Sequence, residues 1–176
     1  MSEIAELLLK LKFMQLIKYI IIYFLLLFVE KNLLHLISIK NVTPDLILIF
    51  VIIVSLREKR SKATLIGFFS GIIQDAFVTH FFGLSALSKS TVGFWGAFFR
   101  RPKKKYNLSS FSVAVVTLVF IHEMIFGFVY NLGTHFGFFR LLLYFIIPRM
   151  LYTFIFALIS YLIFKPMFWK SEELFE

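Results

Sequence analysis

Polar and charged side chains interrupt several long apolar stretches of this sequence, and they are its first candidates for chemistry. They are Gln74, Asp75, Lys89, His122, Glu123 and Arg149. If the stretches cross a membrane, each charge costs about 2.5–3.5 kcal/mol near the bilayer centre and needs a partner or water. The simpler interpretation, which we favour, is that these residues only fix the register of packed helices. The other interpretation is a polar network that opens outward or receives a partner protein.

Depth along the apolar stretches predicts which of these charges pair. With a rise of about 1.5 Å per residue, Asp75 lies roughly 7 Å and Lys89 roughly 9 Å from the outer ends of their stretches. Glu123 and Arg149 each lie roughly 13 Å from theirs. Matched depth and opposite charge predict two ion pairs between helices, Asp75 with Lys89 and Glu123 with Arg149.

The residue patterns of common catalytic and metal sites do not occur in the sequence. The four His residues are scattered, and the absence of Cys excludes disulfides and thiolate metal sites. Neither a phosphate-binding Walker lysine motif nor a G-x-S-x-G nucleophile elbow occurs. We therefore expect no catalytic residues, no cofactor and no metal, and a protein that is not an enzyme.

Composition indicates the solvent around the helices that must position these residues. Of the 176 residues, 60% are apolar and only 16% are charged, too few charges to cover a water-soluble domain. We predict an all-α fold, a polytopic membrane helix bundle that forms one integral membrane domain over residues 1–176. The six expected spans are approximately 16–37, 44–56, 63–79, 83–99, 109–132 and 139–164.

The stretch 44–56 is the shortest of the six, because a full span needs about 20 residues and a shorter one can be re-entrant. Thr43, Pro44 and Asp45 predict a helix start there: a cap, a proline at the first helical position and an acid near the positive helix end. Only six crossings place all basic clusters on one side. We predict six spans with both termini cytoplasmic, and the net charge of +9 then reflects basic cytoplasmic loops rather than nucleic-acid binding.

Small residues and one proline predict how the helices pack. Gly67 and Gly71 repeat at a spacing of four, as do Gly93 and Ala97, and such pairs let helix backbones approach closely. We expect a tight hairpin around residues 79–83. Pro148 should kink the last helix beside Arg149.

The basic run 100–105 has two open interpretations. It could bind anionic lipid head groups or a partner protein, or it could only anchor the topology.

Several short motifs occur in a fixed order, and their order and spacing together resemble a known family. They are Pro44-Asp45, Leu56-Arg57-Glu58, the stretch from Gly67 to Asp75, the stretch from Gly83 to Leu87, and Val92-Gly93. This pattern resembles the rod shape-determining protein MreD family of bacteria. The family often has Gly shortly after the Arg-Glu pair, where this chain has Lys59 and Arg60. Its late proline is matched by Pro148, and the rest of the C-terminal half matches only in hydropathy.

The resemblance implies a non-enzymatic scaffold in the bacterial inner (plasma) membrane that serves cell-wall elongation. Proteins of this family associate with the bitopic protein MreC and, through it, with the filament protein MreB. They also work near the glycosyltransferase RodA and its partner penicillin-binding transpeptidase. The family is thought similar in fold to the six-helix S components of energy-coupling-factor transporters.

That similarity keeps a second function open, an S-component-like subunit that binds a small molecule such as a vitamin. Against it, the first apolar stretch lacks the A-x-x-x-A pattern by which such components dock their energising partner.

Overall fold

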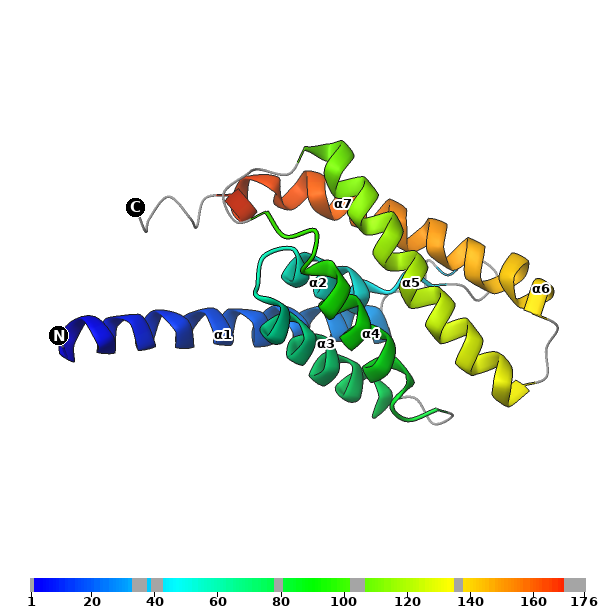
Figure 1. Ribbon diagram of the computed structural model, residues 1–176, viewed down its shortest axis with the longest axis horizontal. Helices are drawn as coiled ribbons and strands as arrows, with labels where there is room; N and C mark the ends of the chain where they lie inside the picture. Colours follow the sequence, from blue (N-terminus) through cyan, green and yellow to red (C-terminus); the bar gives the residue numbers. More distant parts are fainter. Residues whose placement is uncertain are drawn as a thin grey trace.

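The computed structural model describes residues 2–32, 38, 43–77, 81–101, 107–134 and 138–169, and every regular element in these ranges is a helix (Figure 1). In chain order the elements are α1 (Ser2–Asn32), α2 (Leu46–Ser55), α3 (Arg60–Asp75), α4 (Leu84–Gly96), α5 (Leu108–Thr134), α6 (Phe138–Leu141), the π-helical turn η2 (Leu142–Ile146) and α7 (Ile147–Trp169). The predicted all-α class is confirmed. Of the expected spans, residues 33–37 and 78–79 lie outside the described ranges.

The short helix α2 forms the centre of the bundle. Eight of its ten residues are buried, as expected for a helix that is apolar on all sides. Its neighbours in the core come from four other helices: Tyr23 and Leu27 of α1, Val92 of α4, Leu118 of α5 and Ala157 of α7. Ten helical residues extend only about 15 Å, so α2 is half the thickness of a bilayer core.

Helices α3 and α4 form a hairpin whose backbones touch at three glycines. A Cβ atom added at Gly67 would overlap the main-chain carbonyl of Lys89, and one at Gly71 would overlap the backbone of Ala86. A Cβ atom at Gly93 would overlap the carbonyl of Ala63. Lipid gives apolar helices little hydrophobic reason to associate, so close backbone contact supplies much of the attraction.

One of the four expected packing residues lies outside the helix that was expected to contain it. Ala97 lies one position beyond the end of α4 and is half-buried. Gly96 is the residue in close contact, and it faces the side chain of Ser55 on α2. The spacing of four suggested Ala97, whereas α4 already ends at Gly96.

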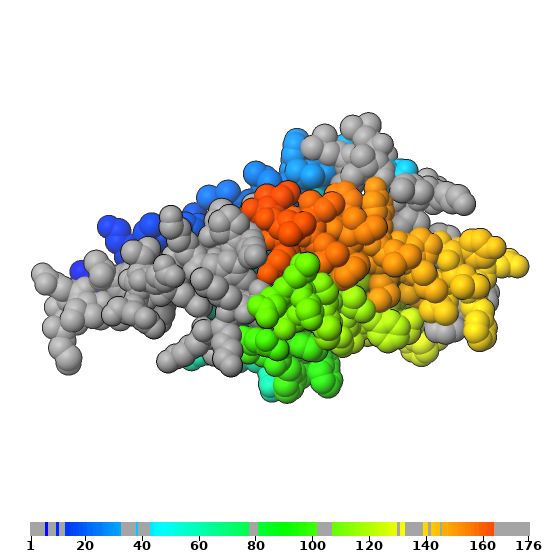
Figure 2. Space-filling model, turned by 90° about the horizontal axis from the view of Figure 1, so that it is seen from above, coloured from blue at the N-terminus to red at the C-terminus, as the bar shows by residue number. Residues whose placement is uncertain are grey.

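Helices α5 and α7 lie side by side along one face of the bundle (Figure 2). Phe111, near the start of α5, stacks on Tyr161, near the end of α7, with ring centroids 4.6 Å apart. The π-helical turn η2 ends two residues before Pro148. Because proline has no N–H and its ring collides with the carbonyl four residues earlier, the wider turn relieves that collision. The predicted kink beside Arg149 stays a prediction.

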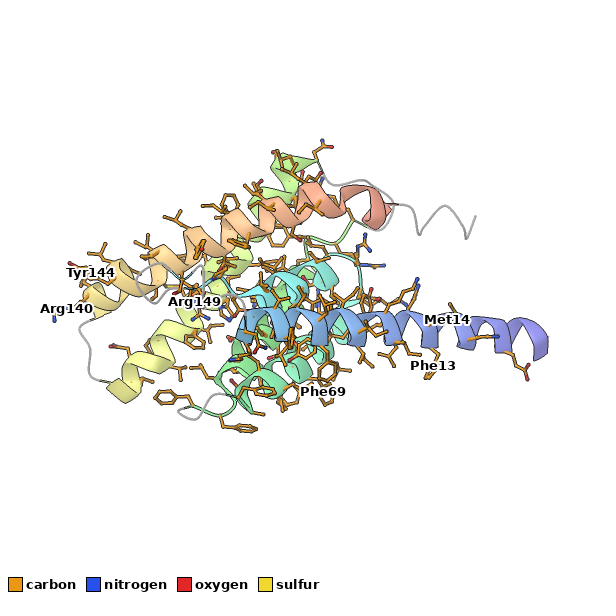
Figure 3. The ribbon with its side chains drawn as sticks, turned by 180° about the vertical axis from the view of Figure 1, so that it is seen from behind. Phe13, Met14, Phe69, Arg140, Tyr144 and Arg149 are labelled. Atoms are coloured by element: carbon orange, nitrogen blue, oxygen red, sulfur yellow. The ribbon has the colours of Figure 1, made fainter. Side chains whose placement is uncertain are left out.

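Helix α1 begins at Ser2, much earlier than the span expected from residue 16. Its N-terminal half extends beyond the other helices, and Phe13 and Met14 point away from the bundle there (Figure 3). The residues before the apolar run include Glu, Ala, Leu and Lys, which favour helix even where no neighbour packs on them.

Loops rich in basic residues gather at one end of the bundle. Arg100 Nε donates a hydrogen bond of 2.7 Å to the carbonyl of Arg57 and thereby joins the α2–α3 connection to the end of α4. Tyr19 of α1 donates a hydrogen bond to Glu58 at the same end. The start of α1 and the end of α7 point in this direction too (Figure 1).

Among the described residues, three helical stretches are long and apolar enough to cross a membrane: Phe13–Asn32, Leu108–Val129 and Leu142–Ile163. Helix α2 is apolar but shorter. A membrane protein with an all-helical bundle is therefore established, while the number of six spans stays a prediction.

Candidate functional site

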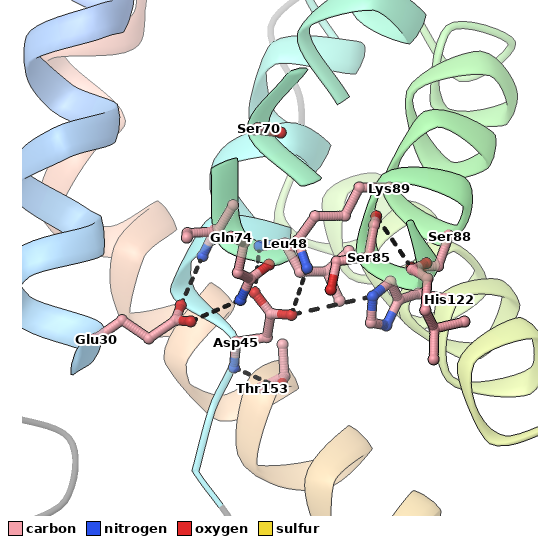
Figure 4. Close-up of polar contacts among 12 residues, drawn as sticks. Glu30, Asp45, Leu48, Ser70, Gln74, Ser85, Ser88, Lys89, His122 and Thr153 are labelled. Carbon is pink, nitrogen blue, oxygen red and sulfur yellow. Dashed lines mark hydrogen bonds and ion pairs between the residues drawn. The ribbon is translucent and has the colours of Figure 1, made fainter. Parts of the chain in front are cut away.

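The side chain of Asp45 lies at the centre of a buried polar cluster (Figure 4). Its Oδ1 accepts a 2.6 Å hydrogen bond from the N–H of Leu48 and so caps α2. Its Oδ2 accepts a 2.7 Å hydrogen bond from Lys89 Nζ. The predicted helix start is present, but with different roles, because Asp45 is the cap and Pro44 precedes the helix.

Lys89 reaches the cluster from α4 and forms a buried ion pair with Asp45, both side chains being 1% exposed. The predicted pairing of Lys89 with Asp75 is therefore wrong. Depth alone suggested Asp75 because both residues lie at similar heights in adjacent helices. The backbone contact at Gly67 lies against Lys89 itself, and from there its side chain reaches the start of α2.

Asp75 instead binds backbone N–H groups at the start of α4. Its two carboxylate oxygens accept hydrogen bonds from Gly83 at 3.0 Å, and from Ser85 and Ala86 at 3.1 Å. These donors carry the positive end of the helix dipole, which favours a carboxylate. Gly83 has a φ of 95°, a left-handed conformation that suits glycine, and this turns its N–H toward Asp75. Asp75 thus connects the end of α3 to the start of α4.

The predicted pair of Glu123 and Arg149 is present. Arg149 Nε lies 3.6 Å from Glu123 Oε1, and its NH2 group lies 3.6 Å from Asp45 Oδ2. The guanidinium also lies over the ring of Phe126, 5.0 Å from the centroid. His122 Nδ1 lies 3.3 Å from Glu123 Oε1. Arg149 therefore links α7 to acids of α2 and α5.

Glu30 of α1 completes the cluster, although the sequence argument did not include it among the candidates. Its Oε1 accepts a 2.7 Å hydrogen bond from Gln74 Nε2, and its Oε2 accepts one of 3.2 Å from the N–H of Ile47. Counted from residue 37, Glu30 lies roughly 10 Å down its stretch. The same depth count that selected Lys89 would have selected Glu30, had it not been treated as an interruption of the run.

Comparison with known proteins identifies a family. The family model described as rod shape-determining protein MreD matches residues 12–168. The chain belongs to the MreD family. No curated protein and no solved structure matches it.

Membership in the MreD family supports a role in determining rod shape. The family match contains every residue of the polar cluster: Glu30, Asp45, Gln74, Lys89, His122, Glu123 and Arg149.

The charges of the cluster nearly balance within the described residues. The carboxylates of Asp45 and Glu123 pair with the cations Lys89 and Arg149, and a third carboxylate, that of Glu30, accepts hydrogen bonds from uncharged groups. Two buried polar atoms of the cluster, Gln74 Oε1 and His122 Nε2, have no hydrogen-bond partner among the described residues.

The cluster joins six helices of the described chain through side chains that lipid would otherwise have to solvate. Unsatisfied polar groups in hydrocarbon cost several kcal/mol each, so every contact favours one arrangement of α1, α2, α3, α4, α5 and α7. Arg149, with 28% of its side chain exposed, is the member of the Asp45–Glu123 group that reaches the surface. The arrangement can fix helix positions and can present a guanidinium at the surface.

Proposed function

We propose that this MreD-family chain is a non-enzymatic scaffold of the cell-wall elongation machinery in the bacterial inner membrane. It crosses the membrane six times, with both termini in the cytoplasm. It binds a bitopic partner of the MreC type and links that partner to a RodA-type glycosyltransferase and a penicillin-binding transpeptidase. MreB filaments are contacted only indirectly.

The family match over residues 12–168 is the observation that carries this proposal. The described structure supports it, because the buried ionisable residues bind one another and the backbone. Lys89 forms an ion pair with Asp45. Asp75 accepts hydrogen bonds from three backbone N–H groups at the start of α4. A rigid bundle of this kind presents fixed surfaces to a partner.

The grouping of basic loops supports the proposed orientation. Arg57 and Arg100 meet at one end of the bundle, toward which the start of α1 and the end of α7 also point. Basic residues concentrate in cytoplasmic loops. The polar cluster around Asp45 then lies in the outer half, so a partner with a large extracytoplasmic part meets the helix ends that the cluster holds.

The proposed roles of the polar residues divide accordingly. Asp75, Lys89 and Gln74 hold α1, α2 and the α3–α4 hairpin together, whereas Arg149 is the candidate for direct contact with the partner. Glu123 positions Arg149, since Arg149 Nε lies 3.6 Å from Glu123 Oε1.

Co-purification from native membranes tests the proposal. The full chain is solubilised in mild detergent and isolated through a tag, and we expect a single-span coiled-coil protein at equal stoichiometry. Recovery of a membrane ATPase module, or of a tightly held vitamin, would contradict the scaffold role and favour the S-component-like function. The matched variants are Asp75→Ala, expected to lose the partner and rod shape, and Phe69→Ala, which is exposed and expected to retain both.

A further inference from the structure

Six basic residues lie where α2 joins α3 and where α4 leads to α5, and we call them the basic rim. They are Arg57, Lys59, Arg60, Lys62, Arg100 and Arg101. The hydrogen bond from Arg100 Nε to the carbonyl of Arg57 holds the two connections together. Positive charges that are separate in sequence therefore form one surface.

Basic residues outnumber acidic residues six to one within residues 57–62 and 100–101. The single acid in these stretches is Glu58. Its Oε1 lies 2.7 Å from Lys62 Nζ and 3.0 Å from the hydroxyl of Tyr19. A surface with this excess of positive charge attracts anions. Salt screens the attraction beyond about 10 Å, so it acts on anions close to the surface.

Arg60 is the member of the basic rim that borders a group of exposed aromatic rings. Its guanidinium carbon lies 4.0 Å from the ring centroid of Phe98 and 4.8 Å from that of Phe94. Both rings are exposed, by 56% and 38%. Trp95, 48% exposed, packs against Phe98 with centroids 5.4 Å apart. A cation thus lies directly on a group of exposed aromatic rings.

We propose that the basic rim and these rings bind an anionic phospholipid, with its phosphate at Lys59 and Arg60 and its acyl chains along Phe94 and Phe98. A phospholipid presents a negative phosphate next to apolar chains, which matches a cation placed on exposed rings. An acidic segment of a soluble protein would leave the rings without a partner. Tryptophan at the level of the head groups agrees with this placement.

The inference depends on the proposed orientation, with the basic rim at the cytoplasmic interface, but on none of the proposed protein partners. It also differs from topological anchoring, the other explanation of basic loops. Anchoring acts through charge during insertion and requires no preference for a lipid type in the folded protein.

Quenching of Trp95 by brominated lipids tests the proposal on the purified full chain. The chain has two Trp residues, so a Trp169→Phe background leaves Trp95 as the single reporter. The protein is reconstituted into phosphatidylcholine vesicles that contain either brominated phosphatidylglycerol or brominated phosphatidylcholine. We expect the affinity of the site at Trp95 for phosphatidylglycerol to exceed that for phosphatidylcholine by at least about fivefold. One interfacial Lys or Arg supplies a preference of this size.

Two double variants distinguish an effect of the basic rim from an effect of the protein's total positive charge. Lys59→Gln with Arg60→Gln should abolish the preference, whereas Lys31→Gln with Arg140→Gln, which removes two charges at the other end of the bundle, should leave it unchanged. Circular dichroism and gel filtration establish that each variant is folded, and Lys59→Arg with Arg60→Lys provides a charge-conserving pair that should retain the preference. Equal quenching by both lipids in the parent, or an unchanged preference in Lys59→Gln with Arg60→Gln, would overturn the proposal. Failure here would leave the co-purification result untouched, because no partner protein is present.

Discussion

Asp45 Oδ2 accepts a 2.7 Å hydrogen bond from Lys89 Nζ while Asp45 Oδ1 caps the helix that starts at the next residue. One carboxylate therefore fixes both the start of α2 and the position of α4. Since α2 is surrounded by the other helices, a change at Asp45 should reach most of the bundle.

Asp45→Asn should destabilise the protein by about 3–5 kcal/mol, the cost of removing one partner of a buried pair. Asparagine keeps an oxygen for the cap but leaves Lys89, whose described ion pair is with Asp45 alone, as an unpaired buried charge. Lys89→Met should cost less, because Asp45 retains Arg149. Unfolding of the purified protein by denaturant in mixed micelles measures both. The double variant should be more stable than Asp45→Asn, and simple addition of the two losses would show that the residues are not coupled.

Gly71→Ala should destabilise the α3–α4 hairpin by about 1–3 kcal/mol, the usual cost of inserting a group into a packed contact. Alanine favours helix over glycine by about 1 kcal/mol, so a loss must come from the overlap with the backbone of Ala86.

Gly83 is the contrasting site, since a Cβ atom there meets nothing within 4 Å but φ is 95°. Gly83→Asn should be milder than Gly83→Ala, because asparagine tolerates this conformation better. The same unfolding measurement applies, and a stabilising Gly71→Ala would contradict the close contact.

Tyr23→Phe and Glu30→Gln should loosen α1 without unfolding the rest. The hydroxyl of Tyr23 donates a 2.8 Å hydrogen bond to the carbonyl of Ser70, worth about 0.5–1.5 kcal/mol. The carboxylate of Glu30 accepts two hydrogen bonds, and charged partners contribute about 1.5–3 kcal/mol, so Glu30→Gln should have the larger effect. The chain has no Cys, which allows spin labels on cysteines introduced at the exposed positions Met14 and Phe69. A distance distribution that broadens equally in both variants, or in neither, would contradict this order.

Pro148→Ala should convert the turn Leu142–Ile146 from π-helical to α-helical geometry. Alanine restores the N–H and removes the ring that collides with the carbonyl of Tyr144. Residues before the turn, such as Arg140, should then rotate by roughly one residue, about 100° around the helix, while Arg149 stays beside Glu123. Cysteine pairs between α5 and residues 139–144 measure the rotation by cross-linking. An unchanged cross-linking pattern would show that another contact maintains the wide turn.

Much of the fold could be predicted from the sequence, because a helix that faces lipid must consist mainly of apolar residues and these form recognisable runs. The stretch 109–132 corresponds to α5 (Leu108–Thr134) within a few residues. Helix α1 extends to Ser2, beyond the span predicted from residue 16, because the charged residues among 2–12 lower the hydropathy of a segment that still favours helix. The sequence left open whether the short stretch 44–56 spans the membrane. Its helix α2 is buried among the other helices, and a helix in that position need not be as long as a bilayer is thick.

The polar cluster was harder to predict because pairing depends on how helices face one another. Glu123 and Arg149 were matched correctly, as both lie deep in long neighbouring helices. Asp45 was assigned only a local role, since a capping aspartate is a sufficient explanation of its position. The sequence does not record that its second oxygen faces Lys89, which follows from the hairpin contact at Gly67.

The sequence separation between hydrogen-bonded partners in the polar cluster has a consequence for insertion during synthesis. Glu30 and Gln74 are 44 residues apart, as are Asp45 and Lys89. At a synthesis rate of about 5–20 residues per second, each acid waits roughly 2–9 s for its partner to emerge from the ribosome. During that time the first two helices hold carboxylates that hydrocarbon rejects. The translocation machinery or interfacial water must accommodate them until the α3–α4 hairpin arrives and supplies Gln74 and Lys89, before α5 and α7 are made.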